Sequence, residues 1–370
     1  MRCEQGRRPP IPDRDKLSLG QLNFNLMANK RSVATITILA VLLLLILREA
    51  SAWRHFNWSV FWHNARDVSL LHALAAIALT YSGYVLRAVR WRVFLRPMKE
   101  VRTTRLLGPT LIGYTGLALL GRPGEFIRPY MIARKERLSL SSQIAVLAVE
   151  RVFDAVSAGV LITAVLVFSP ELQFLPYLAQ FRKGIVTLVT LATIFALMLI
   201  LLARHGQLLS HVLQRVLAPV SMQLAQRASQ HFRLFSSELK MIRDAKSLAQ
   251  IVVLSIATWS LSGLSHLETM HAFAGARRIT FGGAILLLGF GILGSIVQLP
   301  GGGSQQLIAI TAMVKMLGLG TELAMSCTIL GWLTIFMAPV PAGLALLRYE
   351  GSTLRGLCRV SHQDAATITP

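Results

Sequence analysis

The sequence predicts an all-α polytopic membrane protein, a helical bundle of about six crossings plus two re-entrant elements, with both termini in the cytoplasm. Hydrophobic residues make up 54% of the 370 residues and charged residues only 15%, a composition typical of a membrane-embedded chain. Apolar stretches recur that approach the ~20 residues a helix needs to cross a bilayer. Lys and Arg concentrate on alternate connections between these stretches.

The apolar stretches leave no room for a separate soluble domain. We therefore expect one transmembrane domain, residues 33–348, between a basic N-terminal segment, 1–31, and a tail, 349–370. The expected spans are 33–47, 68–86, 144–168, 184–203, 248–272, 281–299 and 323–347.

The first apolar stretch has features of a signal peptide, because a basic segment precedes it and Ala-Ser-Ala follows at 50–52. Arg48 and Glu49, however, directly follow its apolar core, and the polar segment before it is long. These features favour an uncleaved signal anchor, with cleavage as the alternative.

The net charge of +21 could indicate nucleic-acid binding, but the distribution of the basic residues argues against it. A nucleic-acid-binding protein would carry a basic face on a soluble fold. Here 29 Lys and Arg lie on the segments expected in the cytoplasm and 8 on those expected outside. This asymmetry follows the positive-inside rule and places both termini of a multi-pass membrane protein in the cytoplasm. The cytoplasmic segments are 1–31, 87–105, 122–137, 204–246 and 348–370.

Two glycine-marked sequences interrupt the apolar stretches. The first, 121–129, reads Gly-Arg-Pro-Gly-Glu-Phe-Ile-Arg-Pro, and the second, 298–306, reads Gln-Leu-Pro-Gly-Gly-Gly-Ser-Gln-Gln. Non-helical backbone at membrane depth is tolerated only where protein buries it or where it lines a wet cavity. The two motifs therefore predict a polar site inside the bundle.

The charges around these motifs predict re-entrant elements on opposite sides of the membrane. Segment 106–120 is apolar but has basic sequence on both sides, so we expect it to enter from the cytoplasm and return. Segments 281–299 and 307–317 are expected to form a hairpin from outside, with its tip at 300–303. Opposed broken elements of this kind are typical of transporters with inverted repeats, although no sequence repeat is visible here.

The first motif carries the strongest candidate ligand-binding residues. Arg122, Glu125 and Arg128 are spaced by three, which places them along one side of a helix. Guanidinium groups bind phosphate bidentately, and free N–H groups near Gly124 could add donors. The alternative is a charged cytoplasmic loop that only enforces topology.

A second charged cluster lies in the first part of the span 144–168. Glu150 and Asp154 share a helix face, and Arg151 can pair with Asp154. Charges within a span usually face the bundle interior as pairs. We expect Arg151 to meet a headgroup phosphate while the carboxylates orient the arginines. The alternatives are an interfacial position and a purely structural ion-pair network.

The second motif supplies uncharged candidates. Glycines permit close backbone approach, and amides both donate and accept hydrogen bonds. This chemistry suits ligand contact and helix–helix contact equally well. The candidates are Gln298, Gly301, Gly302, Gly303 and Gln305.

No catalytic group, metal site or cofactor is predicted. His266, Glu268 and His271 form an H-x-E-x-x-H string, but histidines five apart point in different directions on a helix. The G-x-G-x-x-G pattern at 289–294 lies in an apolar stretch, where it favours close helix packing over dinucleotide binding.

Three short motifs in this order resemble the membrane domain of lysylphosphatidylglycerol synthases, which also occurs alone in proteins described as flippase-like. They are 121–128, Glu-Arg-Val-Phe-Asp at 150–154, and Pro-Gly-Gly-Gly at 300–303. The resemblance implies an inner-membrane bundle with re-entrant elements that handles polar lipids. By position, the family's charged residues match Arg122, Glu125, Arg128, Glu150, Arg151 and Asp154.

The chain departs from the family pattern in two respects. Relatives often have an acidic residue soon after the late glycines, whereas Ser304-Gln305-Gln306-Leu307 supplies none. Synthases also carry a soluble aminoacyl-transferase domain after the bundle. Only 23 residues follow Leu347, so we do not expect aminoacylation by this chain.

The leading hypothesis is a protein that binds and translocates a polar or anionic lipid, with an anionic phospholipid or lipid-linked glycan as its partner. One alternative is an intramembrane enzyme that uses Glu125, Glu150 or Asp154 as acid or base. The other is an accessory subunit of an envelope-biosynthesis complex. The sequence leaves a homo-oligomer or such a complex open.

Overall fold

The computed structural model describes residues 56–170, 244–295 and 303–349 without interruption, and short stretches between 179 and 222. The chain divides into two compact units, Met1–Asn57 and Trp58–Pro370, and the second is described below. The predicted span 33–47 lies outside the described residues, and the predicted span 184–203 is described only in part.

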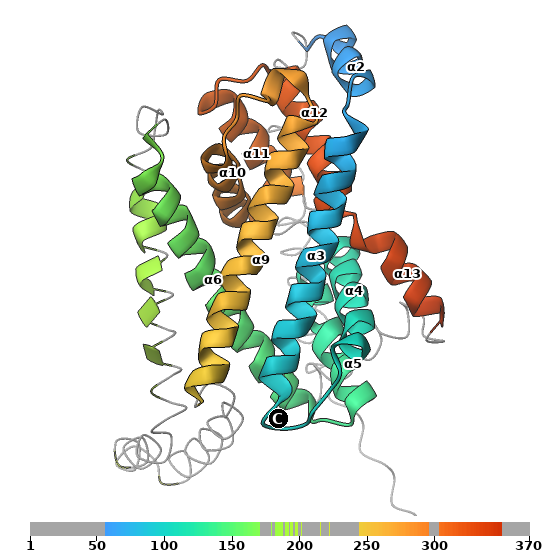
Figure 1. The fold of residues 1–370 in the computed structure, drawn as a ribbon, viewed down its shortest axis with the longest axis vertical. Helices are drawn as coiled ribbons and strands as arrows, with labels where there is room; N and C mark the ends of the chain where they lie inside the picture. Colours follow the sequence, from blue (N-terminus) through green and yellow to red (C-terminus); the bar gives the residue numbers. More distant parts are fainter. Residues whose placement is uncertain are drawn as a thin grey trace, which may run out of the picture. The chain divides into compact units, whose positions relative to one another are not determined.

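Four long apolar helical segments run through the described part of the chain (Figure 1). α3 and α9 lie side by side, and a hydrogen bond from the Ser69 N–H to the Ala272 carbonyl (2.9 Å) joins the start of α3 to the end of α9. The predicted all-helical membrane fold is confirmed, while the number of crossings and their orientation stay predictions. The segments are α3 (Leu70–Leu95), α6 (Leu140–Phe168), α9 (Ala245–His271) and Thr321–Tyr349.

Side-chain caps begin two of these helices. The Asp244 carboxylate accepts hydrogen bonds from the N–H groups of Lys246 and Ser247 at the start of α9. Hydrogen bonding from Ser247 lowers the pKa of Asp244 below its usual value. The Ser139 hydroxyl accepts from the Ser142 N–H at the start of α6. The capped residues satisfy backbone donors that the first helical turn leaves unpaired.

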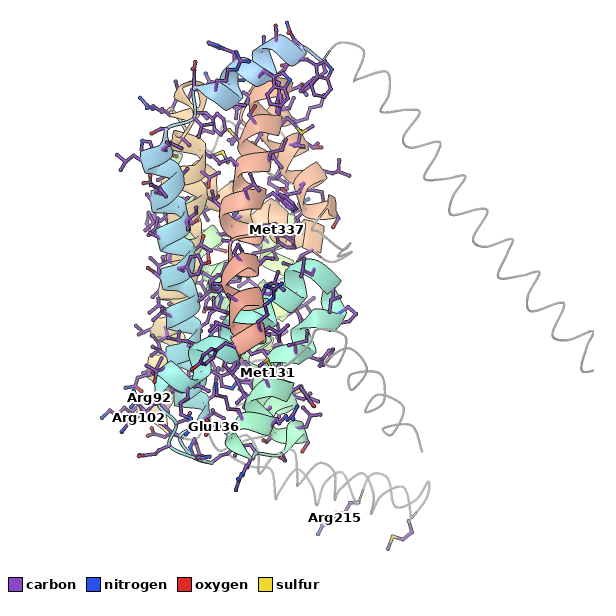
Figure 2. The ribbon with its side chains drawn as sticks, turned by 90° about the vertical axis from the view of Figure 1, so that its right-hand side faces the viewer. Arg92, Arg102, Met131, Glu136, Arg215 and Met337 are labelled. Carbon is purple, nitrogen blue, oxygen red and sulfur yellow. The ribbon has the colours of Figure 1, made fainter. Side chains whose placement is uncertain are left out.

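The last long segment is broken in the middle. α12 (Thr321–Gly331) leads into a π-helical turn (Trp332–Phe336), and α13 (Pro339–Tyr349) continues after a bend near Met337 (Figure 2). Prolines in this region lack N–H groups and interrupt the helical hydrogen bonds. Thr115 donates to the carbonyl of Pro339 at 2.9 Å, so α4 supports the segment just after the bend from the side.

Two pairs of short helices start at opposite ends of the α3–α9 pair (Figure 1). The first pair follows the end of α3, and the second follows the end of α9. Two further short elements are α2 (Trp58–Arg66) and η4 (Ala274–Ala276). The first pair is α4 (Thr103–Leu120) and α5 (Ile127–Glu136), which the short 3₁₀ helix η1 (Arg122–Phe126) connects. The second pair is α10 (Phe281–Gly294) and α11 (Gly303–Lys315).

The predicted boundary of the second span was wrong, because α3 continues nine residues beyond position 86 to Leu95. Trp91 and Phe94 on this extension are completely buried and belong to an apolar core shared with α5, α6 and α9. The basic residues 87–92 therefore lie within the helix and not on a connection.

Basic side chains gather where α3 ends and α4 begins, and Figure 2 labels Arg92 and Arg102 at this end with Glu136. The buried Glu136 carboxylate pairs with Lys99 and Arg105, both at 2.9 Å. These ion pairs tie the end of α5 to the connection between α3 and α4 and to the first turn of α4.

Candidate functional site

The first glycine motif makes a tight turn against its own helix. Gly121 ends α4 with φ of 70°, a left-handed conformation that favours glycine. Gly124 is buried, and a methyl group there would overlap the backbone of Gly116. The Gly124 N–H is not free, because it donates to the Gly121 carbonyl at 2.9 Å. The role of Gly124 in this structure is thus close backbone packing, and ligand binding by other N–H groups near it stays a prediction.

This close packing carries Arg128 into the bundle. Gly113 lies against the Arg128 backbone and Cβ, where a larger residue would not fit. The Arg128 guanidinium then rests on the Trp91 ring, 4.0 Å from its centre, and lies 5.4 Å from the centre of the Tyr114 ring. Arg128 is only 4% exposed, so its charge needs a partner inside the protein.

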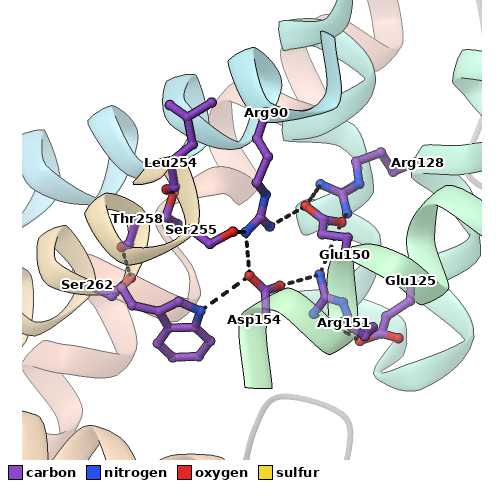
Figure 3. Close-up of polar contacts among 11 residues, drawn as sticks. Arg90, Glu125, Arg128, Glu150, Arg151, Asp154, Leu254, Ser255, Thr258 and Ser262 are labelled. Atoms are coloured by element: carbon purple, nitrogen blue, oxygen red, sulfur yellow. Dashed lines mark hydrogen bonds and ion pairs between the residues drawn. The ribbon is translucent and has the colours of Figure 1, made fainter. Parts of the chain in front are cut away.

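Glu150 is that partner, and it joins three arginines (Figure 3). Its carboxylate accepts from Arg128 and, at 2.6 Å, from Arg90 of α3. Arg151 lies 3.4 Å from the same carboxylate. Glu150 and Arg90 are both completely buried.

Asp154, one turn further along α6, completes the network. Arg90 donates to it at 2.7 Å, and the Trp259 indole of α9 donates at 3.3 Å. Arg151 lies 3.4 Å from its other oxygen. Arg90 also donates to the Ser255 hydroxyl at 2.7 Å, so this one side chain connects α3, α6 and α9.

The network is electrically balanced. Three arginines (90, 128 and 151) meet two buried carboxylates and Glu125, which lies 3.9 Å from Arg151. Glu150 has no exposed surface, whereas the Arg151 side chain is 41% exposed. Among the three arginines, Arg151 is therefore the one placed to meet a ligand.

A cavity of about 270 Å³ opens beside Arg151 and Glu125. Tyr84, Arg87 and Tyr114 form one part of its wall. Ser295, at the end of α10, and Gln305, in α11, form another part. The structure thus brings charged residues near the first glycine motif and one amide residue of the second motif, Gln305, to the same space.

The remaining candidate residues are distributed as follows. Arg122 is exposed and donates to the Ser295 carbonyl at 2.8 Å, so it bridges the two helix pairs. Gly303 is the first residue of α11. Gln298, Gly301 and Gly302 lie outside the described residues.

A second cavity of about 280 Å³ adjoins the first, with Ser262, Ser295, Gln305, Ile335 and Phe336 in both walls. Its lining contains no Asp, Glu, Lys or Arg among the described residues. The π-helical turn of the last long segment contributes Ile335 and Phe336, so the bend in that segment shapes the boundary between the cavities.

The H-x-E-x-x-H residues point to different partners. His266 contacts the Ser262 carbonyl (2.8 Å), whereas His271 contacts the Ile279 carbonyl (2.9 Å). Glu268 contacts the His72 ring of α3 at 2.6 Å. Of the three, Glu268 joins α9 to α3, whereas His266 bonds within α9 and His271 bonds the segment before α10.

Sequence reasoning missed Arg87 and Arg90, because a cluster of basic residues was interpreted as the end of a span. The sequence nevertheless contained a signal that the helix continues through this cluster. Tyr84, Ala88, Trp91 and Phe94–Leu95 continue the apolar face of a helix at spacings of three and four through that cluster.

Comparisons with known proteins indicate the family of the chain. The family profile described as "Lysylphosphatidylglycerol synthase TM region" matches residues 32–343. Glycosyltransferase AglD of Haloferax volcanii is 30% identical over 146 residues, which are 39% of this chain and 23% of AglD. The match thus spans about a quarter of that relative's length. No solved structure matches the chain.

Proposed function

The chain belongs to the family of lysylphosphatidylglycerol synthase transmembrane regions, and from this premise we propose that it binds and translocates a polar or anionic lipid. The observation that carries the proposal is the cavity between the two helix pairs, where Arg151 and Arg87 face open space at the interior of an apolar bundle. Buried charge in a membrane protein is costly and usually marks a pathway for a polar substrate.

We propose that the anionic headgroup enters this cavity while the acyl chains stay in the bilayer. Arg151 is suited to hold a phosphate because Glu150 and Asp154 fix its position and leave part of its surface exposed. The neutral second cavity offers the headgroup a path away from the charges. The substrate class is therefore a membrane lipid with a phosphate-containing headgroup.

The two helix pairs supply the moving parts in this proposal. α4–α5 and α10–α11 start at opposite ends of the α3–α9 pair and meet at the contact between Arg122 and Ser295. Re-entrant elements that open to opposite sides would give alternating access to a fixed site. We place the protein in the bacterial cytoplasmic membrane, with both termini in the cytoplasm.

A reconstitution assay tests the proposal. Purified full-length protein in vesicles that contain fluorescently labelled phosphatidylglycerol should increase the fraction of label that an external reductant reaches. Arg151→Gln should lower this rate about 10-fold or more, because it removes a charge-assisted contact to phosphate. Arg92→Gln is the matched control, because Arg92 is exposed and lines neither cavity.

The proposal fails if wild-type protein neither binds nor moves any labelled anionic lipid or lipid-linked sugar. It also fails if Arg151→Gln and Arg92→Gln behave alike while both remain folded.

A second candidate is an enzyme that acts on a lipid-linked glycan, and the similarity to a glycosyltransferase favours it. Of the described carboxylates, Glu125 lines the cavity, whereas Glu150 and Asp154 are engaged by arginines. Glu125 would therefore be the acid or base. Mass spectrometry of lipids incubated with the protein should then show a new product that Glu125→Gln abolishes.

A further inference from the structure

Among the described residues, the second cavity has an imidazole in its wall but no side chain with a fixed charge. His266 lines it, and the described lining contains no Asp, Glu, Lys or Arg. An anionic headgroup that moves from Arg151 into this cavity leaves its counter-charge behind. Because an unpaired charge in an apolar interior is costly, such a headgroup needs a new counter-charge there.

The hydrogen bond of His266 determines which ring nitrogen can bind a proton. Nδ1 lies 2.8 Å from the Ser262 carbonyl oxygen, which can only accept. Nδ1 therefore carries the proton of the neutral ring, and the lone pair is on Nε2. Nε2 makes no hydrogen bond to the part of the chain that the structure describes. A proton can thus add to Nε2 without breaking a contact.

His266 also has no ion-pair partner among the described residues. Glu268, two residues further along α9, contacts His72 of α3 at 2.6 Å. The lining residues that α10, α11 and the π-helical turn contribute are uncharged, and α12 contributes the Cys327 thiol. A protonated imidazole would therefore carry its charge into the cavity.

The described part of the adjoining first cavity supplies no counter-ion either. Glu125 lies 3.9 Å from Arg151, which engages its carboxylate. Asp154 lies 3.4 Å from Arg151 and accepts from the Trp259 indole, which lines the second cavity. The counter-ion of a protonated imidazole would thus have to come from a ligand. The ionisable side chains in the wall of the first cavity are Tyr84, Arg87, Tyr114, Glu125 and Arg151.

Hydroxyl groups in the wall of the second cavity suit a positive charge. The Ser262 hydroxyl donates to the Thr258 carbonyl at 2.9 Å, and the Thr328 hydroxyl donates to the Ala324 carbonyl at 2.7 Å. Their lone pairs remain to accept hydrogen bonds, either directly or through water. The wall can therefore solvate an imidazolium better than it can solvate an isolated anion.

Proton binding at His266 and anion binding in this cavity favour each other, because each provides the charge that the other lacks. By thermodynamic linkage, the anion strengthens proton binding by the same factor by which the proton strengthens anion binding. A singly charged headgroup and a proton would thus occupy the cavity as a neutral pair.

We propose that the second cavity takes up the anionic headgroup together with one proton on His266, so that lipid and proton move in the same direction. The proton adds to the Nε2 lone pair from water on one side of the membrane. It returns to water when the headgroup leaves on the other side. This inference rests on the proposed function, to which it adds a driving force.

A pH difference across reconstituted vesicles tests the coupling. Full-length protein is placed in vesicles with a trace of fluorescently labelled phosphatidylglycerol, while potassium and valinomycin hold the membrane potential at zero. One coupled proton should enrich the label up to about 10-fold per pH unit in the leaflet that faces the higher pH. An external reductant measures the fraction in the outer leaflet. Because the enrichment is an equilibrium, the orientation of the protein in the vesicles does not affect it.

Three variants assign the proton to His266. His266→Gln cannot bind a proton at this position, so the label should move more slowly and distribute equally. His266→Arg has a permanent charge, so it should restore the rate without restoring the enrichment. His63→Gln is the matched control and should keep the full enrichment, because His63 is exposed and lines neither cavity.

The outcomes separate the inference from the function on which it rests. If wild-type protein moves no labelled anionic lipid or lipid-linked sugar, with or without the pH difference, the proposed function itself is wrong. If wild-type protein moves the label but the pH difference leaves it equally distributed, the function stands and the coupling is overturned. Enrichment that persists in His266→Gln overturns the assignment to His266.

Thermal unfolding checks that the variants are folded, and the wild-type measurement tests the coupling even where they are not. If folded His266→Gln moves no label, His266→Arg decides between two explanations. Movement of the label by His266→Arg supports the role of a counter-charge at this position, and its absence in a folded variant overturns that role.

Discussion

The α4–α5 and α10–α11 pairs both consist of short helices marked by glycines, and they start at opposite ends of the α3–α9 pair (Figure 1). The first pair brings Glu125 and Arg128 to the interior and meets the charged residues of α3 and α6 there. The second pair brings Ser295 and Gln305 to the same cavity without any charge. The difference shows that a short helix pair can carry charge into an apolar bundle where neighbouring long helices supply counter-charges.

The glycines of the two helix pairs also have different packing roles. Gly116 and Gly124 hold two backbone segments in contact within the first pair. In the second pair, Gly294 lies close to the backbone of Gln305, whereas Gly291 has no atom near the position of an added Cβ. The first turn is thus fixed by close packing, and part of the second remains open beside a cavity.

Glu150→Gln should have the largest effect on stability. It tests whether the counter-charges of the long helices stabilise the buried charge that the α4–α5 pair carries into the bundle. The substitution removes the charge on a buried carboxylate that pairs with Arg90 and Arg128. Breaking a buried ion pair from one side typically costs 3–5 kcal/mol, so we expect about that loss in the free energy of unfolding. Chemical or thermal unfolding in detergent measures it.

Glu100→Gln is the matched control, because Glu100 is exposed and undergoes the same change of chemistry. Its unfolding should match that of wild-type protein. Equal stability of the Glu150 and Glu100 variants would show that the network does not support the first pair.

Gly124→Ala should have the next largest effect and tests the difference between the glycines. The added methyl group would overlap the Gly116 backbone, and overpacking of this kind costs about 1–3 kcal/mol. Gly291→Ala, in the second pair, meets open space and should be neutral or stabilising by up to about 1 kcal/mol. Thermal unfolding of the two variants, measured in parallel, tests this difference. Equal shifts in their unfolding temperatures would contradict the different roles of the two glycines.

Much of the fold could be predicted because long helices leave simple signals. Apolar length and the alternation of basic connections located α6 and α9 to within four residues, since 144–168 and 248–272 became Leu140–Phe168 and Ala245–His271. The end of α3 was misplaced because charge normally ends a span. Nothing in the local sequence shows that Glu150 and Asp154 pair with Arg90, since these contacts form only between packed helices.

The site shows the same division between local and tertiary information. Spacing along α6 correctly predicted that Arg151 pairs with Asp154. The spacing of Arg122 and Arg128 predicted a shared face, but Arg128 is buried on Trp91 whereas Arg122 is exposed. Arg122 begins the 3₁₀ helix η1, whereas Arg128 lies in α5, so the two residues do not share one continuous α-helix. Arg87 became a candidate only when Tyr114 of α4 was placed beside it.

The smallest expected change in stability is that of Arg122→Ala, which tests whether the two helix pairs act independently. Arg122 is exposed and donates to the Ser295 carbonyl at 2.8 Å, a contact worth about 0.5–1.5 kcal/mol. Its loss should lower the free energy of unfolding by no more than that amount and should free the end of α10. We therefore expect faster hydrogen–deuterium exchange near Gly294 and Ser295 and an altered rate of lipid movement. Arg92→Ala, which removes an exposed arginine from the same protein, should change neither quantity. If Arg122→Ala leaves both exchange and lipid movement at wild-type values, this contact does not couple the charged pair to the neutral one, and the two pairs would have to communicate through α3 and α9 instead.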